Sequence, residues 1–230
     1  MTVKLNRLFE YPEINRVTHE DGTRFYMDPT DGSPLPSVTT ILSGTSDKTA
    51  IKLWEERVGK EKADRVRKEA TGLGTLMHTH IENYVMGIPR PGGNNLVRLQ
   101  AARMADQIIT KGLPKVDEVW GQEVAMYFPG LYGGMTDLVG VHEGIPSIMD
   151  HKTAKKMRTR DMIVDYFDQM CAYSLAHNEV YGTDIKRGVI FMVSRELDYK
   201  EFILEGLEFD KHMDSFLNRV DIYLKTKAAA

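Results

Sequence analysis

The arrangement of apolar and polar residues divides the chain into a helical first part and a mixed second part. Before residue 112, one charged stretch and two stretches with an apolar helical face predict helices at 50–68, 72–85 and 95–111. Later the period changes to alternation, and strands are expected at 119–128, 136–142, 147–151, 188–194 and 199–204. Two further helices are expected at 161–181 and 210–225.

Turn and cap residues sharpen these boundaries. Residues 14–18 and 24–27 flank a polar turn and predict a β-hairpin. Ser37 is expected to cap a helix over 38–42, because a serine hydroxyl accepts a hydrogen bond from the first helical turn. A tight turn at 142–145 predicts a second hairpin.

The order of the elements predicts an α/β fold, a mixed core with a helical N-terminal part. No linker rich in serine, proline or glycine divides the chain. We therefore expect one domain over residues 1–227, with its core at about 72–227 and an N-terminal hairpin and helical region at 1–71. The terminal alanines, 228–230, are a candidate cloning scar.

Composition narrows the class of protein. Hydrophobic residues make up 42% of the 230 positions and charged residues 27%, which argues against a fibrous or disordered chain. The net charge of −3 neither supports nor excludes a nucleic-acid partner. The lone Cys171 excludes an intramolecular disulfide and a four-cysteine zinc or iron–sulfur site. No stretch approaches the ~20 apolar residues of a membrane span, so we expect a soluble, cytoplasmic protein without a membrane partner.

The candidate chemistry lies in the second hairpin. Asp150 and Lys152 are two residues apart on one strand and so share a face. With the turn centred near Gly144, residues whose numbers add to roughly 288 face one another, which brings Asp137 within diagonal reach of Asp150. Close carboxylates repel each other unless a cation lies between them, and oxygen ligands favour Mg²⁺ or Mn²⁺. The alternative is a surface Asp–Lys ladder.

Three residues elsewhere can extend this site. His78 and Glu82 are four residues apart on the helix at 72–85 and share a face. Either Glu82 satisfies a buried histidine, or His78 reaches the metal and Glu82 orients it. Glu123 lies among apolar neighbours, where it is either a third metal-facing carboxylate or a residue of an exposed edge strand.

Basic and polar residues follow the hairpin. Five positive side chains without an acid suit a phosphate backbone, although a solvated loop has the same pattern: Lys152, Lys155, Lys156, Arg158 and Arg160. Gln169 and Tyr173 are four residues apart on the next helix. This pair either hydrogen-bonds near Lys152 or to a nucleotide, or lies on the helix surface.

Together these motifs resemble the PD-(D/E)XK nuclease superfamily, and within it the RecB-like branch. The branch pattern is Gly-x-x-x-His-x-x-x-Glu, Gly-x-x-Asp, Asp-x-Lys and Gln-x-x-x-Tyr. The matching residues occur in that order: Gly74, His78, Glu82, Gly134, Asp137, Asp150, Lys152, Gln169 and Tyr173. The segment 36–42, followed by Trp54, Glu55 and Arg57, also resembles mitochondrial genome maintenance exonuclease and the small single-domain exonucleases of bacteriophages.

The resemblance implies a restriction-endonuclease-like core, in which helices flank a central mixed sheet. It implies a DNA exonuclease that prefers single strands and uses one or two Mg²⁺ or Mn²⁺ ions, without an iron–sulfur cluster. Asp137 and Asp150 would be metal ligands and Lys152 the catalytic lysine. His78 would be a further ligand, and the carbonyl of His151 would complete the shell.

Other residues take supporting roles in this resemblance. Glu123 matches the acidic residue before the Gly-x-x-Asp strand of the family, and Glu82 supports the metal site. Gln169 and Tyr173 would support the site or the DNA. We interpret Ser37 and Thr39, with the basic helix around 60–68, as candidates for holding a strand end. Lys155, Lys156 and Arg158 are candidates for contacting the DNA backbone.

Two other functions stay open at this point. A structure-specific endonuclease on the same fold would cut circular single-stranded DNA, which an exonuclease leaves intact. A DNA-binding recombination partner would show no metal-dependent cleavage. We expect a phage-encoded enzyme in the host cytoplasm, with a single-strand-binding or recombination protein as a candidate partner.

Overall fold

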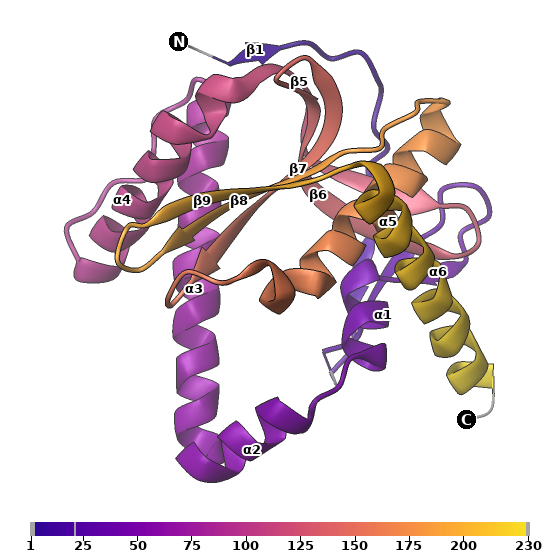
Figure 1. Ribbon diagram of the computed structural model, residues 1–230, viewed down its shortest axis with the longest axis horizontal. Helices are drawn as coiled ribbons and strands as arrows, with labels where there is room; N and C mark the ends of the chain where they lie inside the picture. The colour runs from indigo at the N-terminus through magenta and orange to yellow at the C-terminus, as the bar shows by residue number, and fades with distance from the viewer. Residues whose placement is uncertain (1–2, 21, 229–230) are drawn as a thin grey trace.

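A six-stranded mixed sheet forms the centre of the computed structural model, which describes residues 3–20 and 22–228 (Figure 1). The strand order is β1-β5-β6-β7-β8-β9. Their bounds are Lys4–Leu5 for β1, Val116–Phe128 for β5, Tyr132–His142 for β6, Ile145–Ala154 for β7, Gly188–Ser194 for β8 and Tyr199–Leu204 for β9. The pairs β1–β5 and β7–β8 are parallel and the others antiparallel.

Helices cover both faces of this sheet. Within the described residues they are α1 Val38–Thr45, α2 Thr49–Val58, α3 Lys60–Val85, α4 Leu96–Lys111, α5 Val164–Tyr181 and α6 Gly206–Ala228. Short 3-10 turns, η1 Leu113–Lys115 and η2 Arg160–Ile163, precede β5 and α5. One face packs against α3 and α4, and the other against α1, α5 and α6 (Figure 1). The predicted central mixed sheet flanked by helices is confirmed.

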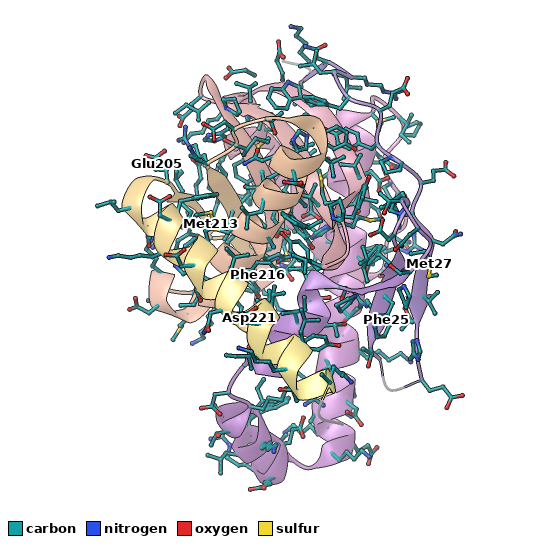
Figure 2. The ribbon with its side chains drawn as sticks, turned by 90° about the vertical axis from the view of Figure 1, so that its right-hand side faces the viewer. Phe25, Met27, Glu205, Met213, Phe216 and Asp221 are labelled. Carbon is teal, nitrogen blue, oxygen red and sulfur yellow. The ribbon has the colours of Figure 1, made fainter. Side chains whose placement is uncertain are left out.

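Strand β8 is buried on both sides because its side chains alternate between the two layers. Ile190 and Met192 join the core under α5 and α6, whereas Phe191 and Val193 join the core under α3 and α4. The helix α6 lies along the flank of the molecule (Figure 2). Its Phe216 is fully buried and meets the ring of Tyr132 edge-on at 5.0 Å between centroids.

A second, three-stranded antiparallel sheet lies before α1. It contains β2 Arg16–Thr18, β3 Arg24–Met27 and β4 Pro34–Pro36. The hairpin of β2 and β3 was predicted; Asp21 in its turn lies outside the described residues. Sequence analysis missed β4 because prolines argue against a strand, and here they are accommodated on an edge strand. The prediction that Ser37 caps α1 is confirmed, since its Oγ accepts from the amide of Thr40 at 3.0 Å.

The helix boundaries around residue 59 differ from those predicted. The break lies at Gly59, with φ 82°, and α3 then continues to Val85 across the gap that was expected between 68 and 72. Gly72 and Gly74 weaken a helix, but Leu73, Met77 and Ile81 bury its second half and maintain it. The first half of α3 and all of α2 extend away from the sheet (Figure 1).

At the end of the chain, α6 begins four residues before the predicted start at 210. It includes Ala228, so that residue of the candidate scar is helical, and 229–230 lie outside the described residues. No helix in the described part of the chain is long and apolar enough to cross a membrane.

Candidate active site

The β6–β7 hairpin brings the two aspartates and the lysine together. Its turn consists of Glu143 and Gly144, both with positive φ, and a two-residue turn of this kind fixes the register of the strands. The ladder ends with Leu138 opposite Met149. The numbers of paired residues therefore add to 287, one less than the predicted sum of roughly 288. The carboxylate Oδ2 of Asp137 then accepts a hydrogen bond from the backbone N–H of His151 at 2.7 Å.

Lys152 connects the hairpin with α5. Its Nζ lies 2.5 Å from Oδ2 of Asp150 and donates to Oε1 of Gln169 at 3.1 Å. The amide of Gln169 in turn donates to the hydroxyl of Tyr173 at 3.1 Å. The Gln–Tyr pair therefore hydrogen-bonds at Lys152 instead of lying on the helix surface.

His78 of α3 faces this hairpin from the other layer. Its Nδ1 lies 3.4 Å from Oδ1 of Asp137 and 3.9 Å from Oε1 of Glu123. Its Nε2 donates to the carbonyl of His151 at 2.8 Å. Burial and the nearby Glu123 carboxylate raise the pKa of Glu82, one turn further along α3. The structure thus brings His78 and Glu123 together beside Asp137, with Glu82 close enough to Glu123 and His78 to interact with their charges.

Burial and the neighbouring charges shift the pKa values of the acidic and basic groups at this site. Burial and the carboxylate of Asp137 raise the pKa of Asp150 to about 6, although Lys152 opposes them. Burial acts in the same direction on Asp137, but His78, His151 and Lys152 hold its pKa well below the usual range. Burial lowers the pKa of His78, yet Asp137 and other carboxylates raise it well above its ordinary value. A proton on the His78 ring therefore offsets negative charge in this group.

These residues fit a divalent cation. One donor atom from each of His78, Asp137 and His151 lies within 4.8 Å of the others. The 3.4 Å between His78 Nδ1 and Asp137 Oδ1 is close to the ~3.0–3.4 Å between neighbouring ligands that bind one ion at about 2.1 Å. A cation in this place would take over the charge that the proton on His78 supplies. The His151 atom in this group is a ring nitrogen. The His151 carbonyl, which was the expected ligand, accepts a hydrogen bond from His78 and keeps a second lone pair.

The backbone at Glu123 is in the left-handed region, with φ 48°, inside strand β5. Its neighbours Gln122 and Val124 pair with Leu138 and Thr136, so the conformation is confined to one residue. A residue other than glycine is strained there, and strain of this kind is concentrated at functional sites. This conformation was not predicted, because a glutamate in a strand gives no signal of a positive φ.

Tyr166 is a site residue that sequence analysis missed. Nζ of Lys152 lies 4.8 Å from the centre of its ring, and the guanidinium of Arg158 lies 5.6 Å from it. Aromatic faces attract such cations. The spacing of Tyr166, Gln169 and Tyr173 places them on one face of α5, and this pattern could have revealed the residue.

Gly134 and Tyr173 pack directly against each other. A Cβ at residue 134 would lie 2.5 Å from Cε1 of Tyr173, so only glycine lets the ring approach β6 this closely. This contact gives a physical reason for finding the Gly-x-x-Asp and Gln-x-x-x-Tyr motifs in one chain.

The basic run after β7 divides into two groups. Lys155, Lys156 and Arg158 are exposed close to Lys152 in sequence. Arg160 is engaged elsewhere, because its Nε donates to Glu208 at 2.7 Å and its Nη2 to the carbonyl of Ile203.

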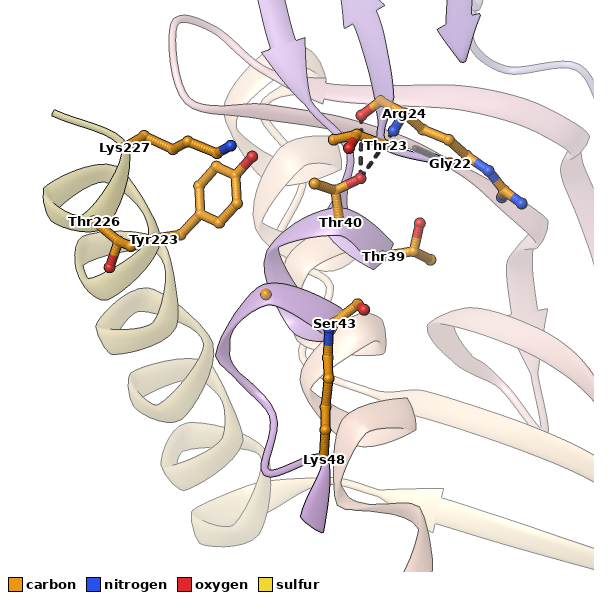
Figure 3. A pocket seen from close by; sticks show the side chains of 11 residues that line it. Gly22, Thr23, Arg24, Thr39, Thr40, Ser43, Lys48, Tyr223, Thr226 and Lys227 are labelled. Carbon is orange, nitrogen blue, oxygen red and sulfur yellow. Dashed lines mark hydrogen bonds between the residues drawn. The ribbon is translucent and has the colours of Figure 1, made fainter. Parts of the chain in front are cut away.

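The two hydroxyl residues at the start of α1 also differ. Ser37 is 2% exposed and its hydroxyl is used in the cap and in contacts with Thr39 and Thr40. Thr39 is exposed and borders a pocket of about 550 Å³ between α1, the β2–β3 turn and the end of α6 (Figure 3). Arg24, Lys48 and Lys227 also line this pocket, which makes it basic.

Comparison with known proteins supports the fold. No protein-family model and no curated protein sequence matches the chain. The crystal structure of a candidate exonuclease from Eubacterium rectale superposes with a TM-score of 0.51 and 14% identity, over 69% of this chain and 65% of that one. An alkaline exonuclease from Laribacter hongkongensis is matched over 67% of this chain and 84% of that one, with 15% identity and a TM-score of 0.32, too low to support an argument. The chain thus spans 65% of the length of the first protein, less than two thirds, and shares its fold over that part.

Proposed function

We propose that this chain is a metal-dependent DNA exonuclease of the RecB-like branch of the PD-(D/E)XK superfamily. It would hydrolyse phosphodiester bonds from DNA ends, prefer single strands and be encoded by a phage. The observation that carries the proposal is the contact of Lys152 with Asp150, beside Asp137 and His78. A shared core with a candidate exonuclease supports it as a likeness of fold.

The residues divide the chemistry among them. Asp137, Asp150 and His78 would bind Mg²⁺ or Mn²⁺, with Glu123 and His151 completing the group. The bound ion would lower the pKa of a water molecule and stabilise negative charge on the scissile phosphate.

Lys152 has the charge and the position to orient the attacking water or to stabilise the transition state. Gln169 holds its ammonium from the other side through the 3.1 Å hydrogen bond. In-line attack on the phosphorus would leave a 5′-phosphate.

Exposed cations next to the site suit a polyanionic substrate. Lys155, Lys156 and Arg158 follow directly after β7 and would contact phosphates. The basic pocket beside Thr39 is a second place where a DNA end could be held. A single-strand-binding or recombination protein is the partner that such an activity implies.

The test uses 5′-labelled and 3′-labelled single-stranded oligonucleotides beside a covalently closed circle, with Mg²⁺ and with Mn²⁺. We expect linear DNA to be degraded and the circle to remain intact, and the label released first gives the polarity. Asp150→Asn and Lys152→Ala should abolish cleavage but preserve the circular dichroism spectrum and DNA binding. The control is Asp184→Asn, which breaks an exposed Asp–Lys pair with Lys186 and should keep full activity.

Each alternative gives a different result. A cut circle would indicate a structure-specific endonuclease. Absence of cleavage with either ion would indicate a DNA-binding module. Full activity in either Asp150→Asn or Lys152→Ala would overturn the site assignment.

A further inference from the structure

A second group of potential metal ligands lies at the turn end of the β6–β7 hairpin. It consists of His142, the last residue of β6, Glu143 in the turn and Glu201 on β9. One donor atom from each lies within 4.8 Å of the others. Five residues of strand separate His142 from Asp137, about 17 Å at ~3.3 Å per residue. This group is therefore distinct from the candidate active site.

The ring of His142 is buried without a hydrogen-bond partner. Its exposure is 0%, and among residues 3–20 and 22–228 neither ring nitrogen has a hydrogen bond. Both nitrogens nevertheless face carboxylates, with Nε2 3.4 Å from Oε1 of Glu201 and Nδ1 3.7 Å from Oε2 of Glu143. Buried polar side chains are normally hydrogen-bonded, so this ring requires an explanation.

The distance from the ring to Glu201 has the length expected of two ligands on one ion. A hydrogen bond between nitrogen and oxygen is about 2.9 Å long, shorter than the distance observed. Tetrahedral ligands at about 2.1 Å from a metal lie ~3.4 Å apart. The Nε2 of His142 and Oε1 of Glu201 are separated by 3.4 Å.

Other charged groups surround these three residues. Nζ of Lys115 lies 3.0 Å from Oε2 of Glu201 and 3.6 Å from Oε1 of Glu143, so it competes with a metal for the carboxylates. Its side chain is 42% exposed and can turn into solvent. Arg187 lies behind the group, 3.7 Å from Glu143 and 3.3 Å from Glu205. The hydroxyl of Tyr199 donates to Glu201 at 3.2 Å.

We propose that His142, Glu143 and Glu201 form a binding site for a divalent transition-metal ion of the Zn²⁺ or Co²⁺ class. An imidazole nitrogen with carboxylate oxygens suits such ions better than Mg²⁺, which prefers oxygen alone. The ion displaces the ammonium of Lys115 and joins the hairpin turn to β9. This site does not depend on the proposed nuclease function.

The experiment measures Co²⁺ binding by visible absorption and Zn²⁺ binding by calorimetry. It uses the full chain with Asp137→Asn and Asp150→Asn, which weakens the candidate active site as a competing site. We expect one ion per chain at the His142 group. In that background Glu201→Gln should weaken binding about tenfold or more, because a ligand is lost. Lys115→Met should strengthen binding, because the competing ammonium is gone.

Two further variants complete the design. His142→Gln should abolish the cobalt absorption, and Glu201→Gln keeps the test valid if the histidine variant does not fold. Glu205→Gln is the matched control, since it removes a neighbouring exposed carboxylate that contacts Arg187 and no ligand. Absence of Co²⁺ and Zn²⁺ binding in the background chain would overturn the proposal. Binding that is equally strong in Glu201→Gln and Lys115→Met would also overturn it.

Discussion

The Nε2 atom of His78 donates to the carbonyl oxygen of His151 at 2.8 Å, and this bond joins α3 to the strand that carries Asp150 and Lys152. It also sets the direction of the ring, because Nδ1 is then the nitrogen that faces Asp137. A histidine held through one nitrogen presents the other in a fixed orientation. Two substitutions can separate these roles.

Replacing His78 by glutamine should preserve the bond to His151, since the glutamine amide reaches the position of Nε2. The nitrogen facing Asp137 would be lost. We expect the Mn²⁺ concentration for half-maximal cleavage to rise about tenfold or more, with little change in thermal stability. A metal titration of the cleavage rate measures this effect, and an unchanged titration would show that His78 does not contact the ion.

Glu123→Gly should relieve the backbone strain at this position and at the same time remove a carboxylate of the candidate site. Glycine adopts the φ of 48° freely, so we expect the free energy of unfolding to rise by about 1 kcal/mol. Cleavage should fall by about tenfold or more because a carboxylate of the site is lost. Glu123→Gln is the control, since it removes the charge and keeps the strained backbone. Denaturant titration should show a gain for glycine that glutamine lacks; equal stabilities would contradict the strain argument.

Tyr166 should act as a positioning residue for Lys152. Tyr166→Leu removes the ring face 4.8 Å from Nζ, an attraction of about 1 kcal/mol. We expect kcat to fall about fivefold. KM should rise less than kcat falls, because Arg158 loses the same ring face but Lys155 and Lys156 keep their positions. Tyr166→Phe keeps the ring and should restore kcat. If phenylalanine is as damaging as leucine, the ring face is not the cause.

Gly134→Ala should disturb the site through Tyr173. The added methyl group would lie 2.5 Å from Cε1 of that buried ring, which must shift and release its bond to Gln169. We expect a loss of about 1–3 kcal/mol in the free energy of unfolding, together with lower activity. Gly72→Ala is the matched control, because nothing lies within 4 Å of its added Cβ in α3. It should stabilise the chain by roughly 0.5–1 kcal/mol.

The fold was largely predictable where local signals agree with packing. The strands β8 and β9 have the predicted bounds, and Ser37 caps α1 as expected. The predictions failed where tertiary contacts overrule local preference. α3 continues through Gly72 and Gly74 because the core covers its second half. The two-residue strand β1 pairs with β5 through too few residues to leave a pattern.

The candidate site was predictable as a set of residues and less so as a geometry. The alternation of residues in a strand was enough to bring Asp150 and Lys152 together. The register was one residue off because the turn has two residues, so its centre lies between Glu143 and Gly144. The position of the His151 ring beside Asp137 was not predicted either. It depends on contacts of the ring with His78 of α3 and Phe191 of β8, which are distant in sequence.

The compact hairpin that carries the site has a consequence for the order of assembly. Asp137, Asp150 and Lys152 come from one short segment, so closing that segment costs little chain entropy. His78 is distant in sequence and reaches them only when α3 docks. Before α3 docks, Lys152 is therefore the residue within the hairpin that offsets the repulsion between the carboxylates. Divalent ions present during refolding would therefore stabilise the closed hairpin through Asp137 and Asp150, and the docked α3 through His78.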